Sequence, residues 1–180
     1  MRKAVFLDRD GVINKATILD GIPKPPKYVE EVMILSGVKK AIKMLNEHNF
    51  EIVVITNQPD VARGNTSKKS VDEINSYLSN RLGINHIFTC YHDDIDGCDC
   101  RKPKPGLLLD AARNLELDLQ KSFLIGDRWR DITAGQAVGC TCFFIDYEYK
   151  EKSPILPFKR VSSLLEATHL ILENHNVFFS

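Results

Sequence analysis

The chain alternates regularly between two kinds of segment, and this alternation constrains its fold more than any other feature. Short apolar runs rich in β-branched and aromatic residues are separated by longer segments whose apolar residues recur every three or four positions. The short runs are typical of buried strands, and the periodic segments are typical of amphipathic helices. The expected strands lie at 4–7, 51–56, 86–90, 122–125 and 141–145.

Four of the periodic segments are predicted to form helices, each with one apolar stripe against the sheet. The last of them, 163–174, begins with Ser163 and Glu166 in the spacing of a capping box. By contrast, the proline-rich segment 21–26 is expected to be an irregular loop. The expected buried stripes are Val38, Ala41, Ile42 and Leu45; Val71, Ile74, Leu78 and Leu82; Leu108, Leu109, Ala112 and Leu115; and Leu164, Leu165, Thr168, Ile171 and Leu172.

Strands that alternate with helices predict parallel pairing through right-handed crossovers. The fold class expected is therefore α/β, a doubly wound, Rossmann-like parallel sheet with helices on both faces. A length of 180 residues fits one domain, 1–180. In such open sheets, ligands bind beyond the carboxyl ends of the strands, so polar residues that follow the predicted strands are the candidate site.

Composition excludes several classes of partner. Lys plus Arg and Asp plus Glu number 24 each, so the chain carries no net charge to attract a nucleic acid or an anionic membrane. The apolar runs fall far short of the roughly 20 residues that cross a bilayer, and the first residues lack the apolar core of a secretory signal. We therefore expect a cytoplasmic protein that acts as a monomer, with no membrane or nucleic-acid partner.

Two aspartates, Asp8 and Asp10, follow the first predicted strand. Residues two apart on an extended backbone point to the same side, so one carboxylate can attack phosphorus while the other exchanges protons with the leaving oxygen and with water. Two carboxylates repel a phosphate unless a cation is present, and oxygen ligands suit Mg²⁺. The alternative is a plain turn, in which Asp10 precedes Gly11 and Asp8 caps local N–H groups.

Further polar residues follow the other predicted strands. Thr56, Asn57 and Gln58 end the second strand with a hydroxyl and two amides that can donate hydrogen bonds to phosphate oxygens. Lys102 offers a point charge for a transferring phosphoryl group, and Arg101 offers a planar fork for a second anionic group. A solvated basic pair is the alternative for these two cations.

Asp127 follows the fourth predicted strand directly, and Asp131 comes four residues later near a helix start. Asp127 is therefore a candidate to complete a metal site with the first aspartates. For Asp131 two roles are open, support of that site from outside or capping of the helix, where the dipole favours a carboxylate.

Taken together, FLDRDG at 6–11, TNQ at 56–58, RKP at 101–103 and GDRWRD at 126–131 resemble the four motifs of the haloacid dehalogenase superfamily of phosphatases. The resemblance implies that Asp8 is the nucleophile and a Mg²⁺ ligand. It implies that Asp10 is the general acid and base, with its main-chain carbonyl on the metal. It further implies that Thr56 and Lys102 hold the phosphoryl group and that Asp127 binds Mg²⁺.

A C-x-H-x5-C-x-C pattern spans residues 90–100. Each pair can place two ligands on one side of an extended arm, and a bend at Gly97 can close the arms around a tetrahedral Zn²⁺ ion of structural type. Such an ion would fix the backbone that delivers Arg101 and Lys102. Disulfide pairing or chance clustering is the alternative. The candidate zinc ligands are Cys90, His92, Cys98 and Cys100.

This loop is similar to that of a group within the superfamily, the D-glycero-D-manno-heptose 1,7-bisphosphate phosphatases and the related histidinol-phosphatase domains. Members of that group lack a large cap domain, and this chain has no insertion of about 60 residues between its early strands. The resemblance implies Mg²⁺-dependent hydrolysis of a small phosphorylated sugar, foremost the heptose 1,7-bisphosphate to its 1-phosphate.

Two other functions are kept open, a histidinol-phosphate phosphatase and a non-catalytic zinc-stabilised binding module. For a doubly phosphorylated sugar, Arg101 and either Arg63 or Lys24 are candidates to bind the second phosphate. Asp60 stands where the heptose group commonly has glycine. Residues that select the sugar are expected within 14–27 and near Asp60.

Overall fold

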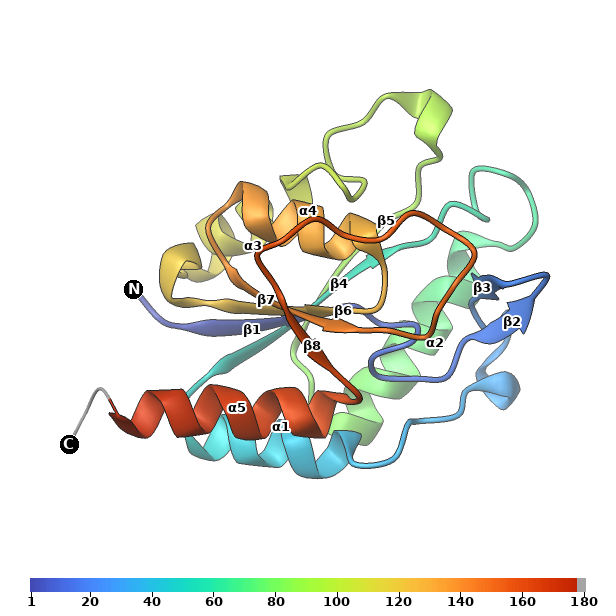
Figure 1. The fold of residues 1–180 in the computed structure, drawn as a ribbon. Coiled ribbons are helices and arrows are strands. Elements are labelled where there is room, and N and C mark those ends of the chain that lie inside the picture. Colours follow the sequence, from blue (N-terminus) through green and yellow to red (C-terminus); the bar gives the residue numbers. More distant parts are fainter. Residues whose placement is uncertain (178–180) are drawn as a thin grey trace.

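The computed structural model describes the backbone of residues 1–177 and the side chains of residues 1–173. Its main sheet has six strands, all parallel, which confirms the expected α/β class (Figure 1). A sixth strand, β8, was not expected from the sequence. In spatial order the strands are β5 (His86–Cys90), β4 (Glu51–Asn57), β1 (Ala4–Leu7), β6 (Phe123–Gly126), β7 (Thr141–Ile145) and β8 (Lys159–Val161).

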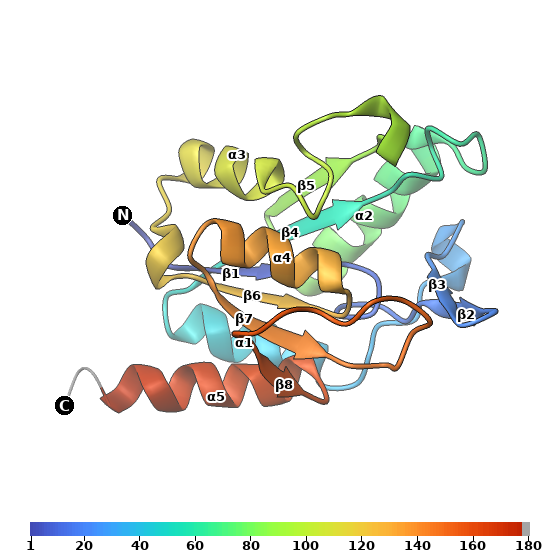
Figure 2. The ribbon, with the colours of Figure 1, turned by 45° about the horizontal axis from the view of Figure 1, so that its top comes forward.

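Helices cover both faces of the sheet, as Figures 1 and 2 show. Side chains alternate along β1, so Val5 and Leu7 pack on one face while Ala4 and Phe6 pack on the other. Both faces of the strand are therefore buried, which explains why its sequence is an unbroken apolar run. The first face is covered by α1 (Val38–Glu47), α2 (Lys68–Leu82) and α5 (Leu164–Val177), and the second by α3 (Gly106–Leu115) and α4 (Trp129–Ala137).

The predicted buried face of α3 is wrong at one position. Leu109 is 43% exposed, and Leu107 and Ala111 are buried in its place beside Leu108. Three consecutive leucines allow two neighbouring stripes with the same period, so the sequence does not fix the rotation of this helix. At the start of the helix, the Gly106 amide donates to the carbonyl of Asp99 at 3.1 Å.

The start of α5 follows the predicted capping box only in part. The hydroxyl of Ser163 accepts a hydrogen bond from the Glu166 amide at 3.2 Å, as expected. The Glu166 carboxylate, however, bonds to the amide and hydroxyl of Ser162, one residue before the expected position. The buried stripe of this helix is confirmed at Leu164, Thr168, Ile171 and Leu172.

The segment 21–26, expected to be an irregular loop, contributes to a hairpin. Strands β2 (Thr17–Leu19) and β3 (Ile22–Lys24) pair antiparallel around Asp20 and Gly21, which both have positive φ. An Asp-Gly pair favours this two-residue turn, and a two-stranded ribbon tolerates a proline because its outer edge needs no donor. The prediction therefore gave too much weight to the prolines and too little to the turn.

The strand order places a crevice at the carboxyl end of β1. The chain passes from β1 to β4 on one side and returns later to β6 on the other, and ligands of open α/β sheets bind where the order reverses in this way. Residues 146–158, which join β7 to β8, form a strap that passes beside α4 (Figure 1). The strap also reaches the hairpin, because the Lys150 amide donates to the Gly21 carbonyl at 2.9 Å.

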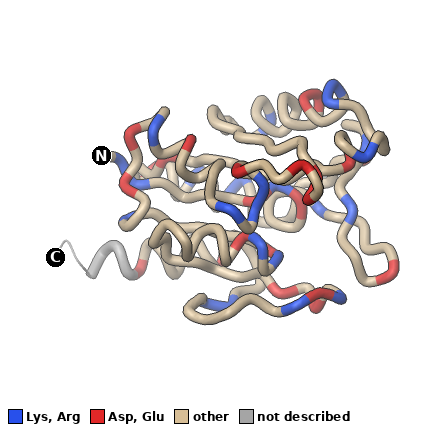
Figure 3. The backbone as a smooth tube through the Cα atoms, turned by 90° about the horizontal axis from the view of Figure 1, so that it is seen from above, with Lys and Arg blue, Asp and Glu red and all other residues tan. Residues whose placement is uncertain are grey.

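Charged residues of both signs are interspersed along the chain (Figure 3). Three short 3-10 helices complete the secondary structure of the described residues. They are η1 (Val29–Glu31), η2 (Asp94–Asp96) and η3 (Leu119–Lys121). Within residues 1–177, every helix is too short or too polar to cross a bilayer.

Gly135, inside α4, provides a test of the packing between this helix and the sheet. A Cβ at this position would lie 2.7 Å from the Cys142 sulfur and 3.1 Å from Leu124 Cδ1. Alanine is worth up to about 1 kcal/mol over glycine in a helix, whereas overpacking costs about 1–3 kcal/mol. We expect Gly135→Ala to lower the free energy of unfolding, measured by urea denaturation. A more stable variant would contradict the close contact.

Candidate functional site

A pocket of about 300 Å³ lies at the carboxyl ends of β1, β4 and β6. Both expected anion-binding cations, three expected carboxylates and one expected amide line it, although they come from four separate segments of the chain. The predicted convergence of these segments is therefore what the structure shows. The predicted site residues that line the pocket are Asp8, Asp10, Asn57, Arg101, Lys102 and Asp127.

The ammonium group of Lys102 lies at the centre of the site. It contacts Asp8 Oδ1 at 2.9 Å, Asp131 Oδ1 at 2.6 Å and the carbonyl of Ile55 at 2.8 Å, one acceptor for each of its three protons. Burial lowers the pKa of Lys102, but the carboxylates of Asp131 and Asp8 raise it by more, so it lies above its usual value. The side chain is therefore a fixed positive charge beside the expected nucleophile.

Asp131 joins Lys102 to the start of α4, so its role in capping the helix is confirmed. Its Oδ1 pairs with Lys102, and its Oδ2 accepts a hydrogen bond at 3.0 Å from the Arg128 amide at the start of α4. Gly126 is necessary for this arrangement, since a Cβ there would lie 2.2 Å from Asp131 Cβ. Within the GDRWRD segment, Asp131 therefore packs closely against the end of β6.

Three carboxylates, those of Asp8, Asp127 and Asp131, each place an oxygen within 4.8 Å of the others. Burial raises the pKa of Asp8 to about 6, with Lys102 opposing the shift and Asp131 and Asp10 adding to it. Burial also raises the pKa of Asp127 well above its usual range, and the charges of Asp8 and Asp131 raise it further. Carboxylates gathered in this way carry more negative charge than one lysine balances.

Asp127 has one carboxylate oxygen available for a ligand. Its Oδ2 accepts a hydrogen bond from the Tyr149 hydroxyl at 2.8 Å, whereas its buried Oδ1 has no hydrogen-bond partner among the described residues. Gly11 lets this side chain approach β1, because a Cβ at position 11 would lie 1.9 Å from Asp127 Oδ2. An unpaired buried oxygen among other carboxylates fits a hard divalent cation such as Mg²⁺.

The carboxyl group of Asp10 is held by three neighbours. It accepts hydrogen bonds from Arg9 Nη2 at 3.0 Å, Asn14 Nδ2 at 2.9 Å and Gln58 Nε2 at 2.8 Å. Arg9 is completely buried and also donates to Asn75 of α2 at 2.9 Å. The sequence did not lead us to assign a role to Arg9 or Asn14. For Arg9, its position between two aspartates at the end of a strand was the signal that could have indicated a role in the site.

The three residues that end β4 have different surroundings. Asn57 lines the pocket and fastens the Lys102 backbone, since its Nδ2 donates to the Lys102 carbonyl at 2.9 Å and its Oδ1 accepts from the Lys102 amide at 3.1 Å. Thr56 and Gln58 are buried behind the pocket, where Gln58 Nε2 donates to Thr56 Oγ1 at 2.8 Å. Both amides are thus engaged within the protein.

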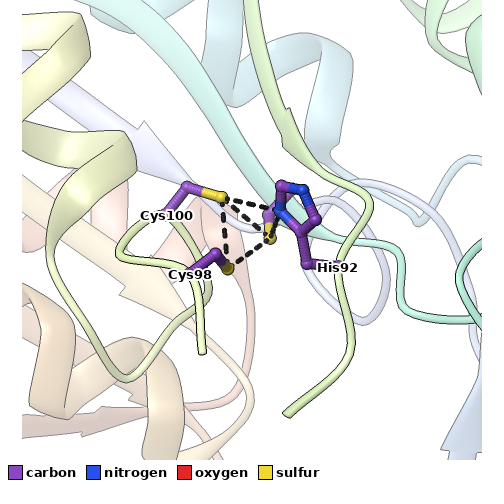
Figure 4. A group of neighbouring side chains, drawn as sticks. His92, Cys98 and Cys100 are labelled. Atoms are coloured by element: carbon purple, nitrogen blue, oxygen red, sulfur yellow. Dashed lines mark hydrogen bonds between the residues drawn. The ribbon is translucent and has the colours of Figure 1, made fainter. Parts of the chain in front are cut away.

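The Cys/His pattern forms one compact cluster, drawn in Figure 4. Its sulfur atoms lie 3.1–3.8 Å apart, and His92 turns its Nδ1 toward them, 3.3 Å from the Cys100 sulfur. These separations are far longer than a disulfide bond of about 2.0 Å, and all five cysteines of the chain are free. A tetrahedral ion with metal–sulfur bonds of about 2.3 Å would separate its ligands by about 3.8 Å, close to the arrangement seen.

The loop that carries this cluster is closed by Lys104. Its ammonium contacts the carbonyls of Gly97 and Cys98 at 3.0 and 2.9 Å. Arg101 follows the cluster directly and donates through Nε to Asp94 Oδ1 at 2.9 Å. The loop therefore delivers Arg101 and Lys102 to the pocket, as the sequence suggested. The other two cysteines, Cys140 and Cys142, are buried in the core.

Two tyrosines of the strap reach the site, and the sequence analysis did not identify them. Tyr147 donates to the Gly11 carbonyl at 3.0 Å, and Tyr149 donates to Asp127 as described above. Their rings stack with centroids 5.6 Å apart. They lie outside the four motifs, and two tyrosines spaced two apart after a buried strand were the sequence signal that could have pointed to them.

Comparison with known proteins identifies the family. A family profile described as haloacid dehalogenase-like hydrolase matches residues 26–139, more than half of the chain. The chain is 34% identical over 148 residues to the D-glycero-beta-D-manno-heptose-1,7-bisphosphate 7-phosphatase of Bordetella bronchiseptica, covering 79% of this chain and 80% of that protein. It is 32% identical over 170 residues to the D-glycero-alpha-D-manno-heptose-1,7-bisphosphate 7-phosphatase of Campylobacter jejuni, covering 91% and 94%.

A solved structure agrees with these relatives. The crystal structure of D,D-heptose 1,7-bisphosphate phosphatase from B. bronchiseptica, complexed with magnesium and phosphate, superposes with a TM-score of 0.85 at 28% identity. The match covers 96% of this chain and 99% of that chain. The chain belongs to the haloacid dehalogenase-like hydrolase family and is a phosphoric monoester hydrolase.

Proposed function

We propose that the protein is a Mg²⁺-dependent phosphatase that removes the 7-phosphate of D-glycero-D-manno-heptose 1,7-bisphosphate and leaves the 1-phosphate. The observation that carries this proposal is the contact between Lys102 and Asp8 within a buried carboxylate cluster at a pocket. The names of the relatives support the heptose substrate, and they include both anomers. The proposal treats residues 1–180 as a single domain acting as a monomer.

The carboxylates of Asp8 and Asp127 would hold Mg²⁺, together with the main-chain carbonyl of Asp10. The unpaired Oδ1 of Asp127 and the mutual approach of the carboxylates support this assignment. Bound there, the ion supplies positive charge that offsets repulsion between the carboxylates and the substrate phosphate. Asp131 pairs with Lys102, so in our proposal it supports the site from outside.

In the proposed reaction, a carboxylate oxygen of Asp8 attacks phosphorus and forms an acyl phosphate, while the bond from phosphorus to the sugar oxygen breaks. Asp10 gives its proton to that oxygen. Asp10 then takes a proton from water, which attacks phosphorus, breaks the bond to Asp8 and releases inorganic phosphate. Lys102 balances the charge that develops on the phosphoryl oxygens.

The entrance of the pocket fits a doubly phosphorylated sugar. Arg101, Arg63 and Lys24 line it in addition to the groups at its base, and they are candidates for the second phosphate. Part of the hairpin, 22–25, also lines the pocket, as does Asp60. Their positions in the pocket wall support the proposal that the hairpin and Asp60 select the sugar.

The four-residue Cys/His cluster would hold a structural Zn²⁺ ion. Three thiolates and one imidazole complete a tetrahedral shell and leave no position for water or substrate. The ion would then fix the loop that precedes Arg101 and Lys102. Its contribution to the reaction is therefore placement of these two cations.

A panel of phosphate esters tests the proposed function. With Mg²⁺ present, we expect the highest kcat/KM with one anomer of the heptose 1,7-bisphosphate, compared with the heptose 7-phosphate, fructose 1,6-bisphosphate and histidinol phosphate. Asp8→Asn should lower kcat by at least about a thousandfold, because the nucleophile is lost. Preference for histidinol phosphate, or turnover that survives Asp8→Asn, would overturn the proposal.

Tyr149→Phe tests whether the strap orients the metal ligand. Loss of the hydroxyl frees the Asp127 carboxylate to rotate, and loss of such a supporting hydrogen bond typically weakens metal binding by tenfold or more. We expect the dissociation constant for Mg²⁺, measured by calorimetry without substrate, to rise by about tenfold. Tyr147→Phe is the matched control and should retain Mg²⁺ affinity. Equal weakening in both variants would mean that the strap acts only as a scaffold.

Cys98→Ala tests the role of the zinc loop. We expect this variant to lose bound zinc, measured by elemental analysis, and to lose much of its activity as Arg101 and Lys102 become less well placed. The circular dichroism of the sheet should persist. Cys140→Ala removes a buried thiol outside the cluster and should keep the ion. Full activity in a zinc-free Cys98→Ala protein would refute this role.

A further inference from the structure

We propose that Arg101 and Arg130 together form the position for the non-reacting phosphate, and that Asp94 occupies this position until substrate displaces it. This inference rests on the proposed function, because it requires a substrate with two phosphates. It adds a specificity residue, Arg130, which lies within the GDRWRD segment but has no role assigned to it above. It also gives the carboxylate of Asp94 a role as an internal competitor.

The Asp94 carboxylate lies between two guanidinium groups. Its Oδ1 accepts from Arg101 Nε at 2.9 Å and from Arg130 Nη1 at 3.0 Å. Its Oδ2 accepts from Arg130 Nη2 at 3.3 Å and from Arg101 Nη2 at 3.4 Å. Two forks that converge on one carboxylate also match a phosphate, which offers a third oxygen and more negative charge.

The two arginines are held in place without Asp94. Arg101 also donates to the His92 carbonyl at 3.4 Å. Arg130 donates to the Lys102 carbonyl at 3.5 Å and lies over the Trp129 ring, 4.8 Å from its centroid. Both guanidinium groups would therefore keep their positions when the carboxylate between them moves away.

The Asp94 carboxylate, by contrast, can move away from the two arginines. Its side chain is 54% exposed and lies on η2, a short 3-10 helix in an exposed loop. Exposed ion pairs contribute little because water replaces the partner readily. The neighbouring Asp93 differs, since it contacts Arg63 at 2.6 Å and also caps η2 through the Asp94 amide. Asp93 therefore has a structural role that Asp94 lacks.

The proposed position belongs to the same pocket as the reacting groups. Asp94, Arg101 and Arg130 all line it together with Lys102. Each arginine directly precedes a residue of the central ion pair, since Lys102 follows Arg101 and Asp131 follows Arg130. The two anion positions are thus built from the same two segments, which fixes their separation and favours substrates whose phosphates match it.

Binding to the Asp8→Asn protein, measured by calorimetry, tests this inference without turnover. The measured quantity is the ratio of the dissociation constants of the heptose 7-phosphate and the heptose 1,7-bisphosphate. Adding Asp94→Asn should tighten bisphosphate binding by about two- to fivefold and raise this ratio, because the competing charge is removed. Adding Arg130→Gln should weaken bisphosphate binding more than 7-phosphate binding and lower the ratio.

Asp99→Asn is the matched control, since it removes the same charge from the same loop. The Asp99 side chain is 96% exposed and contacts Lys104. We expect it to leave the ratio unchanged. A ratio that falls or stays constant with Asp94→Asn, or that changes equally with Asp99→Asn, would overturn the inference alone. Failure of both heptose esters to bind would overturn the proposed function as well.

Discussion

The contact that the site depends on is the one between the Lys102 ammonium and its three acceptors. It joins the end of β1 through Asp8, the end of β4 through the Ile55 carbonyl and the start of α4 through Asp131. Removing a cation from a buried group of carboxylates leaves them unpaired, which is far costlier than breaking a surface pair. The same contact therefore holds three elements together and keeps a positive charge beside Asp8, the proposed nucleophile.

Around this centre, the protein supplies partners for most of its own pocket charges. Asp10 is bound by Arg9, and Asp94 is bound by Arg101 and Arg130. In the group formed by Asp8, Asp127 and Asp131, by contrast, negative charge exceeds the single lysine. The pocket therefore has two regions. The ion pairs of Asp94 mark the proposed region for an exchangeable anion, and the surplus negative charge of the three carboxylates marks the proposed region for a cation.

Much of this arrangement could be predicted because it follows from strand ends. Asp8 and Asp127 each come directly after a buried strand, and parallel strands bring their carboxyl ends to one edge. The face of α3 could not be predicted, since Leu109 and its apolar neighbours satisfy the same period. The partner of Tyr149 could not be predicted either, because this contact joins residues 22 positions apart through a segment without regular structure. Local patterns specify elements, whereas such contacts depend on tertiary geometry.

The bond between Lys150 and Gly21 has a consequence for changing what the enzyme accepts. It ties the hairpin at the mouth to the strap that holds Asp127, and the Lys150 side chain packs where a Cβ at position 21 would lie. Exchanging the hairpin alone for that of another member of the family would break this tie and disturb Asp127, the proposed metal ligand. Redesign of selectivity should therefore transplant both segments as one unit.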